Sequence, residues 1–299
     1  MSTWEIILLG IVQGISEFLP ISSDGHLVIV EALLGHNTEN LSLNIALHFG
    51  TLMSILLVYR KDILPALKQP KLVAAIVVAT LPVVVAALLF GDLFESASNS
   101  PLIAGIGLLY TAGLLFLTPG IDNGTRDMQD IRLRDALVIG LLQALAPLPG
   151  VSRSGSTIVA ALLMGIRRDV AANFSFYIAV PAIAGAVTKE LLFDDLPRTI
   201  ASGPLAAGML VAFVVGVIAL QGLLRIVSAR KLIWFAWYVL VLAVLTILGS
   251  MTGWLSEASP APDNVPPAAV APELNEAPLP EDMSLHQNGA APALSVQDR

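Results

Sequence analysis

The sequence predicts an all-α polytopic membrane protein, and both its composition and its pattern indicate this. Hydrophobic residues make up 56% of the 299 residues, charged residues only 13%, and the mean hydropathy is +0.79. Soluble domains carry about 25% charged residues. Apolar stretches of roughly 18 residues, enough to cross about 30 Å of hydrocarbon, recur along the chain. We therefore expect a bundle of spanning helices rather than a water-soluble fold.

Six of these apolar stretches are predicted to span the membrane, at residues 41–59, 72–90, 101–118, 173–187, 204–224 and 232–248. The first basic residue is Arg60, so the N-terminus lacks the positive region of a cleaved secretory signal, and we expect no cleavage. Residues 251–299 are rich in Pro, Ala and Glu without an apolar period, which predicts a disordered tail. Much of the net charge of -7 belongs to this tail and does not indicate a nucleic-acid partner. Because cysteine is absent, disulfides, thiolate metal sites and cysteine nucleophiles are excluded.

An internal repeat divides the apolar region into two copies, residues 1–120 and 121–250. The segments GIVQGISEFLPISSDGHLVI and GLLQALAPLPGVSRSGSTIV align without a gap at an offset of 130 positions. The offset pairs Gln13 with Gln143, Ile21 with Val151, Ser22 with Ser152 and Gly25 with Gly155. We expect one structural unit to occur twice.

Each copy begins with a predicted re-entrant helical hairpin, at residues 4–35 and 133–166. In both, two short apolar stretches flank a loop of Pro, Ser and Gly, and such backbone is tolerated at membrane depth only where protein or a watery cavity satisfies it. A hairpin followed by three spanning helices leaves the second copy inverted relative to the first. Inverted repeats of this kind bring their broken helices together near the midplane. We therefore expect the two hairpin tips to meet.

The basic residues predict which side of the membrane is which. Of the 16 Lys and Arg residues, twelve fall on one side: Arg60, Lys61, Lys68, Lys71, Arg126, Arg132, Arg134, Arg167, Arg168, Arg225, Arg230 and Lys231. Lys189, Arg198 and Arg299 fall on the other. The positive-inside rule assigns the twelve to the cytoplasm, which places both termini and the acidic loop around Glu95 outside.

The remaining basic residue, Arg153, lies in the second hairpin tip and is a candidate phosphate-binding residue. A permanent cation at membrane depth is costly unless it is compensated, and such residues are by default functional. Arg153 stands between Ser152 and Ser154 at the start of an apolar helix. The guanidinium fork, the hydroxyls and the free backbone N–H groups there suit a phosphate. The alternative is a structural arginine that snorkels or pairs with Glu17.

The first tip gathers Glu17, Ser22, Ser23, Asp24 and His26 within ten residues of apolar sequence. His26 can transfer a proton near neutral pH or attack phosphorus, and Glu17 can orient it or help hold a metal ion. Ser23 is a candidate nucleophile or phosphate ligand, with a plain helix cap as the alternative.

Further polar residues lie on or near the same helices. Gln13 lies one helical turn before Glu17, where it either reaches the same cavity or bonds a neighbouring helix. His48 is interpreted as a packing residue. No pair of histidines has metal-ligand spacing.

These residues resemble the bacterial undecaprenyl-diphosphate phosphatase family of the bacitracin-resistance type, over about residues 4–248. QGISEFLPISSDGH is similar to the family's first motif and PGVSRSGST to its second. By this resemblance Glu17, Ser23, His26 and Arg153 match the family's essential catalytic positions. Supporting positions are matched by Gln13, Ser152, Ser154 and Thr157, and Ser22 belongs with these phosphate-binding candidates.

The resemblance implies hydrolysis of a C55 isoprenoid diphosphate to its monophosphate and inorganic phosphate, which recycles the lipid carrier of peptidoglycan synthesis and gives bacitracin resistance. It also implies help from Mg2+ or Ca2+, and a site open to the outer face of the bacterial cytoplasmic membrane. The expected partners are this lipid and the membrane lipids, with a homodimer left open. Asp24 stands where the family has a small neutral residue such as Thr. We hypothesise that it joins Glu17 in binding the cation.

Two alternatives share some of these features. A transporter of lipid phosphates can be built on the same inverted repeats, although a carrier needs chiefly cations at its site. The phosphatidic acid phosphatase superfamily has similar Ser-Gly-His and Ser-Arg elements, but it requires a further histidine after the arginine. There is none between Arg153 and His286, which disfavours that superfamily.

Overall fold

A computed structural model describes residues 1–36, 41–121, 124–193 and 202–255 of the chain. Most of the predicted tail, residues 256–299, lies outside this range. One compact unit covers Met1–Ser259 and is described here by itself. Within the described ranges the secondary structure is helical, and the only extended pairing is an isolated bridge between Arg126 and Ile166.

The first half of the unit contains helices α1 (Thr3–Ser16), α2 (Ser23–Leu33), α3 (Leu41–Val58), α4 (Ile63–Leu67), α5 (Pro70–Leu89), α6 (Gly91–Ser98) and α7 (Pro101–Phe116). Two short 3-10 turns follow, η1 (Thr118–Gly120) and η2 (Met128–Asp130). The second half contains α8 (Leu133–Gln143), α9 (Arg153–Leu163), α10 (Arg168–Phe193), α11 (Ser202–Ser228) and α12 (Ile233–Met251).

Five helical segments of the described chain are long and apolar enough to cross a membrane: Pro70–Leu89, Pro101–Gly120, Arg168–Leu192, Ser202–Ser228 and Ile233–Met251. Their outer faces expose large apolar side chains, for example Leu88 of α5 at 78% and Ile218 of α11 at 67%. Apolar surface on this scale is expected where lipid, not water, surrounds the helices. The predicted all-α, multi-pass membrane fold is confirmed. The remaining predicted span, residues 41–59, forms α3, which belongs with the shorter apolar helices.

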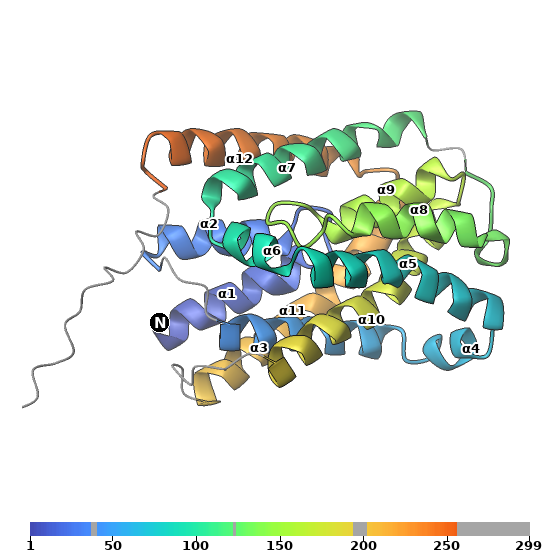
Figure 1. Cartoon of the computed structure of the whole chain (residues 1–299), viewed down its shortest axis with the longest axis horizontal. Coiled ribbons are helices and arrows are strands. Elements are labelled where there is room, and N and C mark those ends of the chain that lie inside the picture. Colours follow the sequence, from blue (N-terminus) through green and yellow to red (C-terminus); the bar gives the residue numbers. More distant parts are fainter. Residues whose placement is uncertain (37–40, 122–123, 194–201, 256–299) are drawn as a thin grey trace, which may run out of the picture. The chain divides into compact units, whose positions relative to one another are not determined.

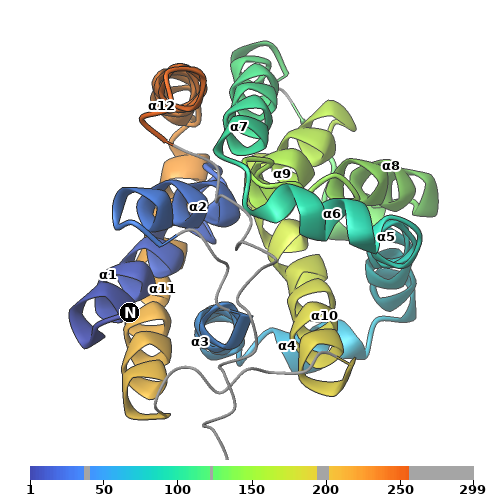
Figure 2. The same ribbon diagram turned by 60° about the vertical axis from the view of Figure 1, so that its left-hand side comes forward.

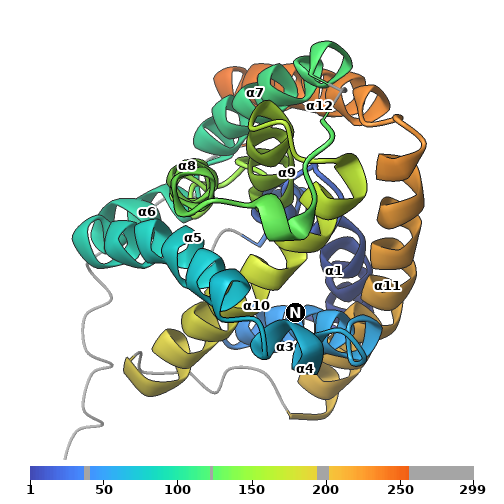
Figure 3. The ribbon, with the colours of Figure 1, turned by 90° about the vertical axis from the view of Figure 1, so that its right-hand side faces the viewer.

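Helix α10 lies at the centre of the unit. It packs against α3, α5, α9 and α11, and Figure 3 shows it between α5 and α11. Phe174, Phe176 and Ile178 of α10 are fully buried. The helix extends beyond the predicted 173–187 at both ends because polar flanking residues continue it past the apolar stretch. Pro181 lies inside it, as membrane helices tolerate where neighbouring groups satisfy the freed carbonyl.

The other helices pack in close pairs, α7 with α12 and α1 with α11, as Figure 2 shows. Small residues permit the close approach. A Cβ atom on Gly10 of α1 would lie 2.7 Å from the carbonyl oxygen of Gly208 on α11, and one on Gly14 would lie 2.9 Å from that of Ala212. Membrane helices associate in this way because lipid provides no hydrophobic drive to bring them together.

The two helical hairpins approach the interior from different ends of the unit, α1–α2 from the left of Figure 1 and α8–α9 from the right. Their tips touch. The Ser154 hydroxyl donates to the Leu19 carbonyl over 3.1 Å, and a Cβ atom on Gly25 would lie 2.9 Å from the Cα atom of Gly150. Segments 130 positions apart in sequence thus form one junction. The repeat boundaries and the inversion stay predictions.

The segment around Glu95 differs from the expected loop. Residues Gly91–Ser98 form helix α6, in which Asp92 lies in the first turn, where a carboxylate interacts favourably with the helix dipole. Eight residues with four polar or charged side chains show too short an apolar pattern to reveal a helix in the sequence.

Candidate active site at the hairpin junction

The first tip connects the end of α1 to the start of α2. Glu17 is the C-cap residue of α1, and Ser22 is the N-cap of α2, where its Oγ accepts a hydrogen bond from the Gly25 N–H over 3.2 Å. Ser22 has φ 71° and ψ 109°, a conformation that costs about 1–3 kcal/mol in a non-glycine residue and occurs preferentially at functional sites. The strained turn aims the first residue of α2, Ser23, back towards Glu17.

The second tip is held by a threonine that the sequence did not single out. Thr111 of α7 donates to the Gly150 carbonyl over 2.8 Å and accepts from the Ser152 N–H over 2.9 Å. Ser152 caps α9 by accepting from the Gly155 N–H over 3.0 Å. These bonds satisfy non-helical backbone inside the membrane, as such backbone requires. Gly150 adopts φ 86°, which an L-residue rarely adopts.

An ion pair joins the two tips. Arg153 Nη2 lies 2.6 Å from Glu17 Oε1, and the two side chains are 13% and 6% exposed. The other carboxylate oxygen, Oε2, accepts from Gln13 Nε2 over 3.1 Å and from Ser23 Oγ over 2.8 Å. The structure therefore brings together four of the predicted site residues: Gln13, Glu17, Ser23 and Arg153. The pairing of Arg153 with Glu17, stated above as the structural alternative, also occurs.

Arg153 has donor capacity left over after this pairing. Its Nη1 is buried and has no hydrogen-bond partner among the described residues. An unsatisfied buried donor costs about 1–3 kcal/mol, more when it is charged. Arg153 is also the first residue of α9, where the unpaired N–H groups of the helix start favour an anion. A ligand with anionic oxygens would satisfy both the Nη1 donor and the N–H groups at the start of α9.

His26 faces two partners from different parts of the chain. Its Nδ1 lies 2.7 Å from the Ser22 carbonyl oxygen, and its Nε2 lies 2.8 Å from the Tyr238 hydroxyl on α12. The two rings stack with centroids 5.8 Å apart and planes inclined by 20°. Tyr238 lies in a uniformly apolar helix with no motif around it, so the sequence provides no signal for its role.

His48 lies in the site rather than simply packing within α3. Its Nδ1 donates to the Asn44 carbonyl over 2.9 Å, and its Nε2 lies 3.7 Å from Glu17 Oε2 and 3.7 Å from Asp24 Oδ1. Asn44, His48 and Thr51 share one face of α3 at spacings of four and three residues. That polar stripe on an apolar helix is the sequence signal that could have identified His48.

The remaining predicted phosphate-binding hydroxyls bond within the protein. Ser154 bonds the first tip, as described above, and lies 3.3 Å from the Ser152 hydroxyl. Thr157 is fully buried, donates to the Arg153 carbonyl over 2.8 Å and lies 2.7 Å from the Ser175 hydroxyl on α10. Their contact with phosphate stays a prediction.

The two glutamines that the repeat aligns have different hydrogen-bond partners. Gln13 donates to Glu17. Gln143, its counterpart in the second copy, donates instead to the Ala79 carbonyl of α5 over 3.1 Å. The two halves of the junction are therefore unequal, with the carboxylate cluster in the first tip and the cation in the second.

The predicted cation ligands fit one mode of binding. Within the described ranges no group of three or more His, Cys, Asp or Glu residues is arranged to hold a metal ion, so the side chains alone do not form a cage. Glu17 and Asp24 nevertheless flank the same His48 nitrogen. Mg2+ is commonly held by one or two carboxylates together with substrate phosphates, and this pair suits that arrangement.

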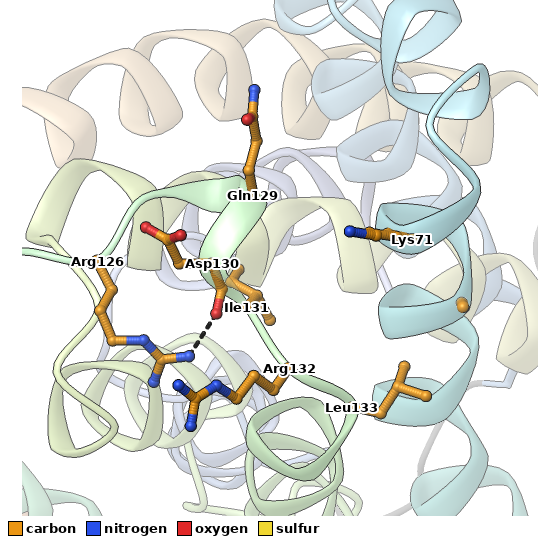
Figure 4. A pocket seen from close by; sticks show the side chains of 8 residues that line it. Lys71, Arg126, Gln129, Asp130, Ile131, Arg132 and Leu133 are labelled. Carbon is orange, nitrogen blue, oxygen red and sulfur yellow. Dashed lines mark hydrogen bonds between the residues drawn. The ribbon is translucent and has the colours of Figure 1, made fainter.

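A pocket of about 640 Å3 lies elsewhere, between the start of α5 and the start of α8 (Figure 4). Lys71, Arg126 and Arg132 contribute positive charge to its lining. Arg126, however, bonds Asp135 and the Met164 carbonyl, so its charge is already used within the protein. None of the predicted site residues lines this pocket, and the junction of the tips is the better candidate site.

Comparison with known proteins identifies the family of the chain. The family model described as bacitracin resistance protein BacA matches residues 6–245. An undecaprenyl-diphosphatase of Alkaliphilus metalliredigens is 41% identical over 84% of this chain and 100% of its own length. The undecaprenyl-diphosphatase of Rhodopirellula baltica is 43% identical over 82% of this chain and 96% of its own. Undecaprenyl-diphosphatase 3 of Bacillus cereus is 39% identical over 84% and 99%. Both hairpin tips and all the candidate site residues fall within the matched range, and the chain belongs to the bacitracin resistance protein BacA family.

Proposed function

We propose that this protein is a membrane phosphatase that hydrolyses undecaprenyl diphosphate to undecaprenyl phosphate and inorganic phosphate. The names of its relatives support this substrate. The observation that carries the proposal is the buried Arg153 Nη1, which lacks a hydrogen-bond partner among the described residues although Nη2 pairs with Glu17, the carboxylate that also binds Ser23. A diphosphate has anionic oxygens that can accept a hydrogen bond from this donor.

Binding depends on the two helix starts that converge at the junction. Arg153 Nη1 and the first backbone N–H groups of α9 hold phosphate oxygens, while Nη2 stays on Glu17. The isoprenoid tail lies along the apolar outer faces of the helices, so only the head group enters the site. Charge and positioning then supply most of the rate enhancement, as is general in phosphoryl transfer.

Ser23 is the attacking group in this scheme because its Oγ already donates to a carboxylate, Glu17 Oε2, over 2.8 Å. Ser23 Oγ forms a bond to the terminal phosphorus, its proton passes to Glu17, and the bond from phosphorus to the bridging oxygen breaks to release undecaprenyl phosphate. Water then cleaves the serine phosphate to give inorganic phosphate and restore the hydroxyl. His26 provides the neutral ring nitrogen that can accept a proton from that water.

Glu17 and Asp24 would hold a divalent cation, Mg2+ or Ca2+, together with the diphosphate. When bound, the cation offsets the charge that grows on the transferred and leaving phosphates. The contribution of the chain is to bring the Glu17 and Asp24 carboxylates beside His48 and Arg153 against Glu17, so that one diphosphate could meet both the cation and the guanidinium.

The protein is proposed to lie in the bacterial cytoplasmic membrane with the site open to the outside and both termini outside. The distribution of basic residues supports this orientation. The basic residues in four connections belong to the group of twelve assigned to the cytoplasm, namely those in α3–α5, η2–α8, α9–α10 and α11–α12.

Phosphate release by the purified full-length protein tests the function, with undecaprenyl or farnesyl diphosphate as substrate. We expect release by the wild type and a loss of at least about 10²-fold in Arg153→Ala, the scale seen when a charge-stabilising donor is removed. Arg60→Ala, which removes an exposed arginine whose Nη1 donates to the nearby Leu57 carbonyl, is the matched control. Lipid translocation without phosphate release would show the alternative, a lipid-phosphate transporter.

A further inference from the structure

The hydroxyl of Tyr238 completes the hydrogen bonding of the His26 ring. Nδ1 lies 2.7 Å from the Ser22 carbonyl oxygen, which can only accept, so Nδ1 carries the proton. In the neutral ring Nε2 then holds the lone pair, and the Tyr238 hydroxyl 2.8 Å away donates to it. Nε2 is thus the nitrogen of His26 that is free to react once a water comes between it and the tyrosine.

Tyr238 reaches His26 from the opposite end of the chain. It lies 212 positions away on α12, a helix that packs chiefly on α7, and it is 48% exposed. The pair therefore sits at the rim of the junction, towards the lipid-facing surface, whereas Glu17 and Arg153 lie deeper, at 6% and 13% exposure. A head group that enters sideways from the membrane would meet the tyrosine and histidine first.

We propose that Tyr238 is a positioning residue for the hydrolysis proposed above, on which this inference rests. The Ser22 carbonyl sets the tautomer with the proton on Nδ1, and the Tyr238 hydroxyl holds the ring so that Nε2 is the reacting nitrogen. When the site fills, the attacking water comes between the two groups: it accepts from the Tyr238 hydroxyl and donates to Nε2, so the tyrosine still acts in the reacting state. Without the hydroxyl the ring keeps its stacking partner but loses the bond that sets its orientation.

Tyr238→Phe separates these two contacts because it keeps the ring and removes only the donor. A neutral hydrogen bond contributes a net effect that corresponds to roughly three- to tenfold in rate. We expect kcat to fall by that factor. KM should change less than about twofold, because the variant leaves Arg153 and its phosphate-binding donor untouched. Tyr177→Phe is the matched control, since Tyr177 of α10 packs edge-on against Tyr59, which follows α3.

Steady-state phosphate release from farnesyl diphosphate by full-length protein in detergent gives the first test. The set comprises wild type, Tyr238→Phe, Tyr177→Phe, His26→Gln and the double variant His26→Gln/Tyr238→Phe. Because Tyr238 acts through His26, its substitution should cost nothing further on the His26→Gln background. Wild-type kinetics in Tyr238→Phe, or an equal loss on both backgrounds, would overturn the proposal.

Nitrogen NMR of protein labelled with ¹⁵N-histidine gives a readout that needs no activity. The chain has four histidines, and His26→Gln identifies the His26 signals by their loss. We expect protonated Nδ1 and unprotonated Nε2 for His26 in the wild type, and a shift of these signals alone in Tyr238→Phe. Unchanged His26 signals would refute the role of Tyr238 even if the enzyme were active. Failure of the wild type to release phosphate would refute the proposed function instead, while the NMR result would still decide the tautomer.

Discussion

Arg153 Nη2 and Glu17 Oε1 lie 2.6 Å apart although 136 positions separate the two residues. This ion pair links the hairpin tips together with the Ser154–Leu19 hydrogen bond, and both partners of the pair are largely buried. A buried pair adds little net stability over an apolar pair, but removal of one partner leaves a costly uncompensated charge. The pair is therefore a sensitive point for both folding and function.

Glu17→Gln should destabilise the protein, because it leaves the Arg153 guanidinium unpaired at membrane depth. The expected loss is about 3–5 kcal/mol in the free energy of unfolding, measured by thermal or denaturant unfolding in detergent. The double variant Glu17→Gln/Arg153→Met removes both charges and should recover most of that loss while remaining inactive. If the double variant were as unstable as the single one, the charge would not be the cause.

Gly25→Ala should reduce activity because the tips have no room for a methyl group. The added Cβ would lie 2.9 Å from the Gly150 Cα and 3.0 Å from its backbone nitrogen, so the tips must separate, which lengthens the contact between Glu17 and Arg153. Misplacement on this scale can cost about 10²-fold in kcat. Gly113→Ala on α7, where nothing lies within 4 Å of the new Cβ, is the control. Equal activities in the two variants would contradict the close approach.

Ser23→Ala should abolish a covalent phosphoenzyme and lower kcat by roughly 10³-fold or more, as expected for loss of a nucleophile. Substrate labelled in the terminal phosphate, followed by an acid quench, measures the intermediate. A serine phosphate survives acid whereas a phosphohistidine does not. An acid-labile label that disappears in His26→Gln and persists in Ser23→Ala would transfer the attacking role to His26.

Asp24→Thr should raise the concentration of Mg2+ needed for half-maximal phosphate release, because it removes one of the two carboxylates assigned to the cation. EDTA should inactivate the wild type, and added Mg2+ or Ca2+ should restore its activity. An Asp24→Thr protein whose divalent-metal dependence matches the wild type would exclude Asp24 as a ligand. Asp62→Thr, an acidic residue before α4 and distant in sequence from both tips, serves as the control.

Single cysteines introduced into the cysteine-free chain should report its orientation. Ser96→Cys, on the exposed surface of α6, should react in intact cells with a thiol reagent that does not cross the membrane. Lys68→Cys, in the exposed connection between α4 and α5, should react only after the membrane is opened. The reverse pattern would invert the proposed topology and place the site on the cytoplasmic side.

The sequence by itself determined that the chain is a multi-pass helical membrane protein, because hydrocarbon admits only long apolar helices and their pattern is local. It also identified the two tips and the polar residues in them, since Glu17, His26 and Arg153 stand out against apolar neighbours. Helices α4 and α6 were not predicted because five and eight residues are too few to show a helical pattern.

The tertiary structure decided which of these groups meet. Three contacts between distant segments could not be read from the sequence: the pairing of Arg153 with Glu17, the bonds from Thr111 to the second tip, and the bond from Gln143 to the Ala79 carbonyl. His48 and Tyr238 reach the site only through the placement of α3 and α12. Helix periodicity depends on residues that are close in sequence, whereas the partner of a side chain depends on how the helices pack.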